Sequence, residues 1–65
     1  MNITYQGKKL STAAATPAAL AAELQIDAAH TIFELNGEII PPGGDLNVPL
    51  ADGDEINAFR IVAGG

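Results

Sequence analysis

The sequence predicts an α+β fold, in which a mixed sheet of four to five strands carries one main helix packed on one face. Residues 1–6 and 56–61 alternate apolar and polar side chains and contain β-branched residues, a pattern typical of strands. Between them, residues 16–25 begin with Thr-Pro and consist mostly of strong helix formers. The 65 residues leave room for one small domain, residues 1–65.

The N-terminal third predicts a hairpin followed by the helix. Gly7-Lys8 suits a tight turn between residues 1–6 and a short second strand over residues 9–12. Thr16 is expected at the N-cap and Pro17 at the first helical position, where a missing N–H costs nothing. The helix should end near Gln25, with one narrow apolar stripe facing the sheet.

Two short strands are expected in the middle of the chain. Residues 31–36 form the first, with Phe33 and Leu35 facing the core, and an Asn-Gly pair suits the turn that follows. Residues 38–40 form the second, which stops at two prolines. Because proline cannot donate to a ladder, this strand should lie at an edge of the sheet.

The last strand is the longest β-favouring stretch. Residues 46–50 lead into it as an irregular segment, and Asp52-Gly53-Asp54 forms a tight turn before it. Alternation places Ile56 and Ala58 on one face and Phe59, among others, on the opposite face. After an antiparallel hairpin and a crossing helix, this strand fits best beside the first, running parallel to it. The element order therefore predicts the β-grasp (ubiquitin-like) fold.

Composition excludes several classes of function. Three basic residues against eight acidic ones give a net charge of −5, which is too little clustered positive charge for nucleic-acid binding. An acidic surface suits either docking on a basic patch of another protein or simple solubility. Without cysteine, the chain has no disulfide, thiolate nucleophile or cysteine–zinc site. Apolar runs are far shorter than the ~20 residues that span a bilayer, and no signal peptide is visible, so we expect a cytoplasmic protein away from membranes.

The strongest candidate for chemistry is the C-terminal end. The last strand should deliver the free α-carboxylate of Gly65, which with a pKa of about 3.3–3.7 is an anion at neutral pH. Such a group can attack the α-phosphate of ATP to form an acyl adenylate. Gly64 and Gly65 have no Cβ to block a narrow channel. We expect residues 63–65 to be a flexible tail reaching about 10 Å when extended.

Other candidate residues favour structural roles. His30 is the only histidine and is expected at the surface rather than in catalysis. The turn at residues 52–54 lacks the spacing of an EF-hand calcium loop, and no metal site is expected. Glu34 and Glu38 are expected to be solvated carboxylates rather than an acid/base pair.

At this point the sequence resembles the small sulfur carrier proteins of thiamin biosynthesis, the ThiS family, over its full length. The resemblance rests on four stretches: Thr16-Pro17, Leu35-Asn36-Gly37-Glu38-Ile39-Ile40-Pro41, Leu50-Ala51-Asp52-Gly53-Asp54-Glu55-Ile56 and Phe59-Arg60-Ile61-Val62-Ala63-Gly64-Gly65. Family members commonly carry an arginine after the proline and a tryptophan soon after. This chain has Pro42-Gly43-Gly44-Asp45 there, which puts any partner contact of that loop in doubt.

The resemblance implies a protein that is not an enzyme and binds no cofactor. A ubiquitin-activating-type adenylyltransferase would use ATP to adenylate Gly65, and sulfur relayed from a cysteine desulfurase would convert it to a thiocarboxylate. Thiazole synthase would then take the sulfur. Gly64 and Ala63 would give access, and Phe59 and Ile61 would contact the activating enzyme, unless Phe59 packs against a neighbouring loop.

Three alternatives stay open at this stage. The small subunit of molybdopterin synthase shares the fold and the tail, although those chains are usually longer. Carriers for cysteine or siderophore-type sulfur chemistry are also related. A β-grasp interaction module with an incidental diglycine end belongs to a different class.

Overall fold

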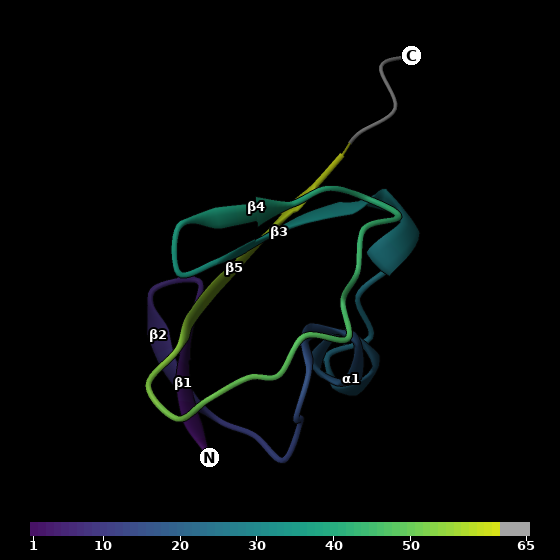
Figure 1. The fold of residues 1–65 in the computed structure, drawn as a ribbon. Helices are drawn as coiled ribbons and strands as arrows, with labels where there is room; N and C mark the ends of the chain where they lie inside the picture. The colour runs from purple at the N-terminus through teal and green to yellow at the C-terminus, as the bar shows by residue number, and fades with distance from the viewer. Residues whose placement is uncertain (62–65) are drawn as a thin grey trace.

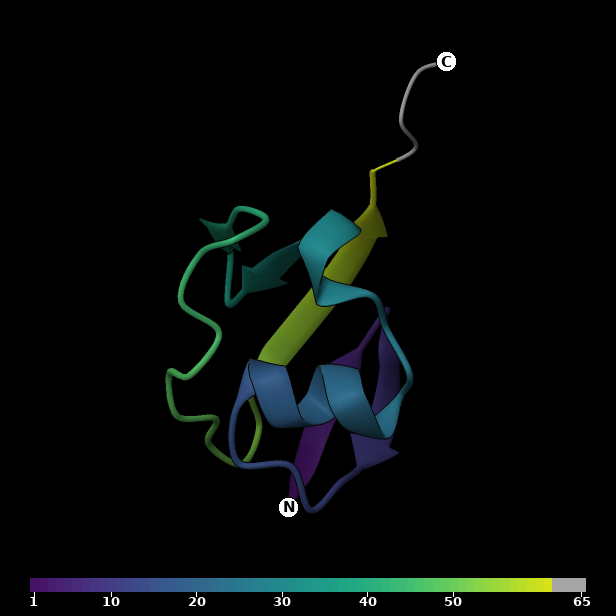
Figure 2. The same ribbon diagram turned by 90° about the vertical axis from the view of Figure 1, so that its right-hand side faces the viewer.

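The computed structural model describes residues 1–61, which contain five strands, one α-helix and one short 3-10 helix. In chain order these are β1 (Asn2–Tyr5), β2 (Lys8–Ser11), α1 (Pro17–Glu23), η1 (Ala28–His30), β3 (Thr31–Leu35), β4 (Glu38–Ile40) and β5 (Glu55–Arg60). The strands form one sheet, and α1 crosses one of its faces (Figures 1 and 2). No helix within residues 1–61 is both long enough and apolar enough to cross a membrane.

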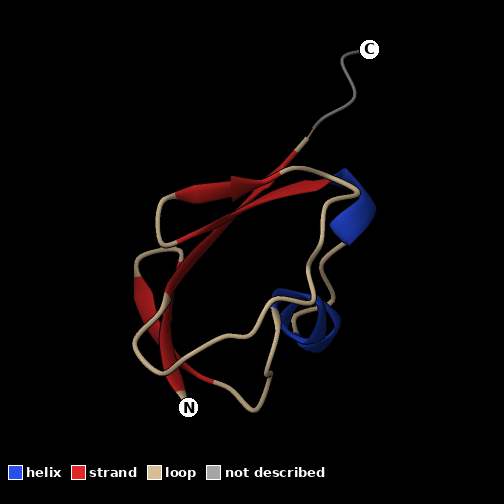
Figure 3. Ribbon diagram, in the orientation of Figure 1, coloured by secondary structure: helices blue, strands red, loops and turns tan. Residues whose placement is uncertain are grey.

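The last strand lies in the middle of the sheet. The strand order is β2-β1-β5-β3-β4, with β5 parallel to β1 and antiparallel to β3 (Figure 3). The predicted parallel pairing of the first and last strands is therefore confirmed. The proline-flanked strand β4 lies at an edge, as its sequence predicts. This is the β-grasp arrangement of a mixed sheet with one helix.

The helix begins and ends where local chemistry dictates. Thr16 has extended backbone angles, and its hydroxyl accepts the N–H of Ala19 at 3.1 Å. Pro17 occupies the first turn, as predicted. The helix stops at Glu23, two residues before the predicted end, because Gln25 adopts a left-handed conformation with φ of 58°.

The core lies between α1 and the sheet. Its largest fully buried side chains are Phe33, Ile3, Leu20 and Ile56, each at most 2% exposed. Full burial of one such apolar side chain stabilises the fold by about 1.5–3 kcal/mol. These residues come from β3, β1, α1 and β5, so the core itself ties the helix to the central strands.

Both hairpin turns in the sheet use a left-handed residue followed by glycine. Gln6 and Gly7 have φ values of 51° and 79°, and Asn36 and Gly37 have 51° and 85°, which is the pattern of a type I′ turn. The prediction of Gly7-Lys8 as the first turn is wrong by one residue. With the turn one residue earlier, β2 starts at Lys8.

The reason for that shift lies in the register of the hairpin. The observed register places Leu10 opposite Ile3. Leu10 packs against the core that Ile3 helps to form. The later turn would instead have set Thr12 opposite Ile3. Contact between the two apolar side chains thus favours the earlier turn.

The irregular stretch between β4 and β5 is fastened to the start of the helix. The N–H of Ala18 donates to the carbonyl of Leu46 at 2.9 Å, and the N–H of Leu50 donates to the carbonyl of Ala15 at 2.8 Å. Leu50 is 7% exposed and belongs to the core, while Leu46 packs against it. The predicted role of residues 46–50, covering the end of the core without regular structure, is confirmed.

Candidate functional site

The candidate site begins where β5 ends. The predicted tail residues Ala63, Gly64 and Gly65 lie outside the described residues, so the structure describes the base from which they extend. That base is the end of the central strand, at Arg60 and Ile61, with β3 on one edge, while the turn after β1 reaches the other edge only at Ala58. The features of this base determine what a partner of the tail would meet first.

The two faces of β5 differ as the alternation predicts. Ile56 is fully buried and Ala58 packs against the core, whereas Phe59 and Ile61 are 51% and 42% exposed. No loop covers Phe59 within the described residues, so its ring is open to solvent. The exposure of both side chains agrees with the role implied by the resemblance, and their contact with a partner remains a prediction.

Two further apolar side chains share this face and were missed by sequence reasoning. Ile32 pairs directly with Phe59 across β3 and β5, and Ile39 on β4 is 56% exposed. Ile39 pairs with Glu34, which is two residues from Ile32 on the same face. We call Ile32, Ile39, Phe59 and Ile61 the outer patch. The sequence could have indicated Ile32 and Ile39, because side chains alternate between the two faces along β3 and β4. Ile32 is next to the core residue Phe33 and must therefore face the opposite side.

A carboxylate borders the outer patch. Glu34 is half-buried beside Asn57, whose Nδ2 donates to its Oε1 at 3.0 Å. The expectation that Glu34 is simply solvated is therefore wrong, because a cross-strand hydrogen bond holds it. Glu38 is exposed, as expected, but pairs with the inward-facing Leu35. The two carboxylates thus belong to opposite faces of the sheet, which rules out an acid/base pair.

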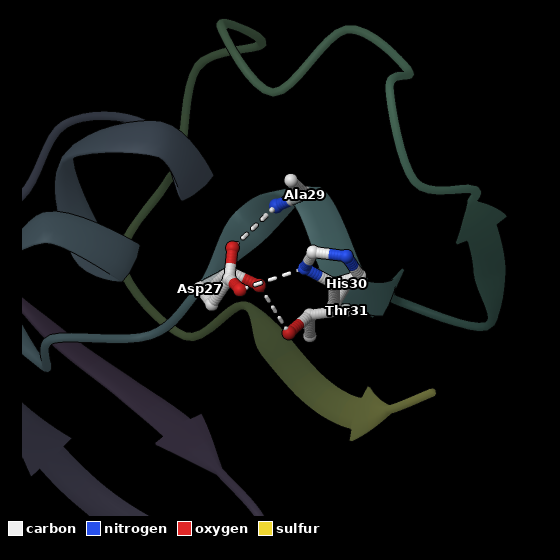
Figure 4. A network of polar contacts seen from close by, with 4 residues as sticks. All are labelled: Asp27, Ala29, His30 and Thr31. Carbon is white, nitrogen blue, oxygen red and sulfur yellow. Dashed lines mark hydrogen bonds and ion pairs between the residues drawn. The ribbon is translucent and has the colours of Figure 1, made fainter. Parts of the chain in front are cut away.

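A small polar network fixes the turn beside the end of β5 (Figure 4). Asp27 accepts the N–H of Ala29 at 3.1 Å, and its other carboxylate oxygen lies 2.7 Å from His30 Nδ1. Thr31 Oγ1 donates to the carbonyl of Asp27 at 2.7 Å. The hydrogen bond with His30 holds the pKa of Asp27 below its usual value of 3.8.

This network orders the chain next to the tail. The carbonyl of His30 accepts the N–H of Ile61 at 2.8 Å, which extends the pairing of β3 and β5 by one residue. The His30 side chain is 65% exposed, so its predicted surface position is confirmed, although it lies in η1 rather than in a plain loop. His30 thus contributes its backbone carbonyl to Ile61 and its ring to Asp27.

The carboxylates of the turn before β5 accept hydrogen bonds from neighbouring N–H groups rather than bind a cation. Asp52 Oδ1 accepts the N–H of Asn2 at 2.6 Å, and Asp54 Oδ1 accepts Asn36 Nδ2 at 3.1 Å. Gly53 has φ of 89°, which a residue with a side chain would adopt only with strain. Within residues 1–61, no three His, Cys, Asp or Glu side chains gather closely enough to hold a metal ion.

Comparison with known proteins adds two findings. The ThiS family model matches residues 3–65. Among solved structures, the chain is similar to the thiamine biosynthesis protein (ThiS) from Geobacter metallireducens, with 28% identity, a TM-score of 0.80 and full coverage of both chains. No curated protein matches the chain.

The match reaches from β1 to the terminal glycine pair, and the solved structure shares the five-strand sheet and its helix over the whole length. The fold, the central final strand and the glycine end therefore occur together in one known group of proteins. From this we conclude that the chain belongs to the ThiS family, the non-catalytic sulfur carriers of thiamine biosynthesis.

Proposed function

We propose that the α-carboxylate of Gly65 is the group that carries sulfur in this protein. The observation that carries the proposal is that the family match extends through the glycine pair, which follows the central strand β5 by only a few residues. A carboxylate so placed extends from a fixed base and has no side chain beside it. The body of the domain then serves to present the chain end.

The proposed chemistry has two steps, each with a defined leaving group. A carboxylate oxygen of Gly65 attacks the α-phosphate of ATP, and pyrophosphate leaves. Sulfide attacks the acyl carbon, AMP leaves, and a thiocarboxylate remains; when the sulfur instead arrives as a protein persulfide, AMP leaves to give an acyl disulfide, which a thiol cleaves by forming a disulfide with the other sulfur. The protein supplies the reacting group, while the partner supplies ATP binding and proton transfer. The thiocarboxylate donates its sulfur to thiazole formation.

The outer patch is the proposed contact with the ubiquitin-activating-type adenylyltransferase. Phe59 and Ile61 form its β5 side, and Ile39 on β4 widens it by a further strongly exposed side chain. Exposed aromatic and aliphatic side chains grouped on one face are typical of binding surfaces. The net charge of −5 and the bordering Glu34 favour a partner with basic residues around an apolar pocket.

Two further partners follow from the same proposal. Thiazole synthase is the acceptor of the sulfur, and a cysteine desulfurase relay is its indirect source. The small subunit of molybdopterin synthase remains the alternative role for a carrier of this fold. A rescue experiment separates the two roles, because a thiazole-requiring strain and a molybdopterin-requiring strain need different acceptors.

Intact-mass spectrometry tests the proposal directly. The protein is incubated with ATP, the adenylyltransferase and a sulfur source, and one oxygen is expected to be exchanged for one sulfur. A variant lacking Gly65 is the matched control, and it should fold normally but keep its mass. An unchanged mass of the full chain, or thiazole synthesis supported by the truncated chain, would contradict the proposal.

A further inference from the structure

The central strand β5 extends beyond the end of its parallel neighbour β1. The pairing of β1 with β5 consists of Thr4 with Glu55 and Tyr5 with Ile56, whereas β5 continues to Arg60. On the β3 side, pairing continues to the end of the strand. Residues 57–60, the last four of the six in β5, therefore have a strand on one edge only.

The side chain of Gln6 fills the place of the missing strand. Its backbone N–H donates to the carbonyl of Ile56 at 3.3 Å, which closes the ladder. Its side-chain Oε1 then accepts the N–H of Ala58 at 3.1 Å, and its Nε2 donates to the carbonyl of Ala58 at 2.8 Å. One amide group thus satisfies both backbone groups of Ala58, as the N–H and C=O of one residue in an antiparallel neighbouring strand would.

The turn geometry makes this reach possible. Gln6 occupies the first left-handed position of the β1–β2 turn, with φ of 51°. A residue with a side chain adopts this conformation at a cost, and a glycine or asparagine would fit the turn more easily. Neither of them carries an amide on a stem as long as that of glutamine. The choice of glutamine is accounted for by its two bonds to Ala58.

The opposite edge of β5 is held three residues further along, at Ile61. There the carbonyl of His30 accepts the N–H of Ile61, and the Asp27 side chain fixes the turn that presents this carbonyl. The strand is therefore held from two sides, by Gln6 at Ala58 and by His30 at Ile61. A groove of about 230 Å³ lies beside this part of β5, lined by Tyr5, Ala58 and Arg60 together with Thr31 and residues 25–27.

We propose that Gln6 is a positioning residue, whose side-chain amide, together with the His30 turn, holds residues 58–61 of β5 in place for a partner that binds the chain end. The inference rests on the proposed function, because an ordered strand end matters only if the chain end must enter the active site of another protein. A chain end whose base is already ordered loses less conformational entropy on binding. Gln6 thus raises the affinity for the partner although it lies outside the outer patch.

Hydrogen exchange at the Ala58 amide tests the physical part of the proposal. Gln6→Ala should speed this exchange about tenfold, since two exposed hydrogen bonds that each contribute modestly are lost. Gln6→Glu keeps the size of the side chain but sets an oxygen against the Ala58 carbonyl, so it should speed exchange as well. If Gln6 acted through packing alone, Gln6→Glu would leave the exchange rate unchanged, and this would overturn the proposal.

Gln25→Ala is the matched control. Gln25 is also an exposed glutamine with a left-handed backbone, at φ of 58°, and the structure gives its side chain no hydrogen bond within residues 1–61. Substitution there keeps an alanine in the same left-handed conformation as Gln6→Ala does, without removing a bond. In the Gln25→Ala variant, the amide of Ala58 should exchange at the same rate as in the wild-type protein.

Adenylation kinetics test the functional part. Gln6→Ala should raise the KM of the adenylyltransferase for this protein about fivefold, with kcat little changed. The reason is that a less ordered end of β5 weakens binding but does not alter the chemical step. Faster Ala58 exchange with an unchanged KM would overturn the positioning role. If the wild-type chain is not modified at all, the proposed function fails, while the exchange measurement still decides whether Gln6 holds the strand.

Discussion

Asn36 and Asp54 join the two turns that flank the central strands. Asn36 Nδ2 donates to Asp54 Oδ1 at 3.1 Å, and Asn36 Oδ1 accepts the N–H of Glu55 at 2.9 Å. Asp54 Oδ2 also accepts the N–H of Ala51 at 2.8 Å. The start of β5 is thereby fixed to the β3–β4 hairpin. The Asn-Gly and Asp-Gly-Asp stretches thus form one structural unit.

Substitution of Asn36 should destabilise the fold. Asn36→Ala removes two hydrogen bonds and places alanine at φ of 51°, so we expect a loss of about 1–3 kcal/mol in the free energy of unfolding. Asn36→Gly keeps the turn relaxed and loses only the bonds, so its loss should be smaller. Urea denaturation measures both, and equal losses would show that the backbone conformation contributes nothing.

The outer patch should affect binding without affecting stability. Phe59→Ser removes an aromatic side chain that is 51% exposed, so the affinity for the adenylyltransferase should fall about tenfold or more. Ile39→Ser should give a smaller loss in the same direction. Titration calorimetry measures the affinity, and Gln25→Ala provides a control on another surface. Wild-type affinity in both variants would place the contact elsewhere.

The core should respond to the loss of a single methylene group at β5. Ile56→Val, at a side chain that is 0% exposed, should lower the free energy of unfolding by about 0.5–1.5 kcal/mol. The same substitution at Ile39, which is 56% exposed, is the matched control and should change stability little. Thermal or chemical denaturation gives the comparison, and similar losses at both sites would contradict the assigned faces of the sheet.

The Asp27–His30 pair should make a pH-dependent contribution. Because the pKa of Asp27 is lowered in the folded state, its stabilising contribution is present above the ordinary value of 3.8 and is lost as pH falls through the folded pKa. His30→Ala should move the Asp27 pKa upward, since the hydrogen bond with His30 is the main cause of the shift. An NMR titration of the Asp27 carboxyl group measures this, and an unchanged pKa would refute the cause.

The N-cap of the helix offers a local test. Thr16→Ala removes the hydroxyl that accepts the Ala19 N–H, and should cost about 0.5–2 kcal/mol of stability. Thr16→Ser retains the hydroxyl and should restore most of the loss. Denaturation experiments on the two variants provide the measurement. A loss of the same size in Thr16→Ser would point to the methyl group instead of the hydrogen bond.

Local patterns were sufficient to predict most of the fold. The Thr16-Pro17 start of the helix, the edge position of β4 and the two faces of β5 all follow from spacing and backbone chemistry within a few residues. The first turn was misplaced by one residue because the apolar pairing of Ile3 with Leu10 decides its register. That pairing depends on the assembled sheet.

Contacts between distant residues explain what the sequence did not predict at the candidate site. The bonds of Gln6 to Ala58 join residues 52 positions apart, and nothing in the sequence around Gln6 indicates them. Ile39 could have been added to the outer patch, because it alternates with Ile40 in the same way that Phe59 alternates with Ala58. Its place on the same face of the sheet as Phe59, however, required the strand order.

The central position of β5 also has a mechanical consequence. A force on the end of β5 along the strand axis loads its hydrogen bonds in shear. Since β5 is bonded to β3 on one edge and to β1 and Gln6 on the other, two rows of bonds share this load. An outermost strand would have only one such row. The order of the strands therefore strengthens the fold against a pull on its last strand.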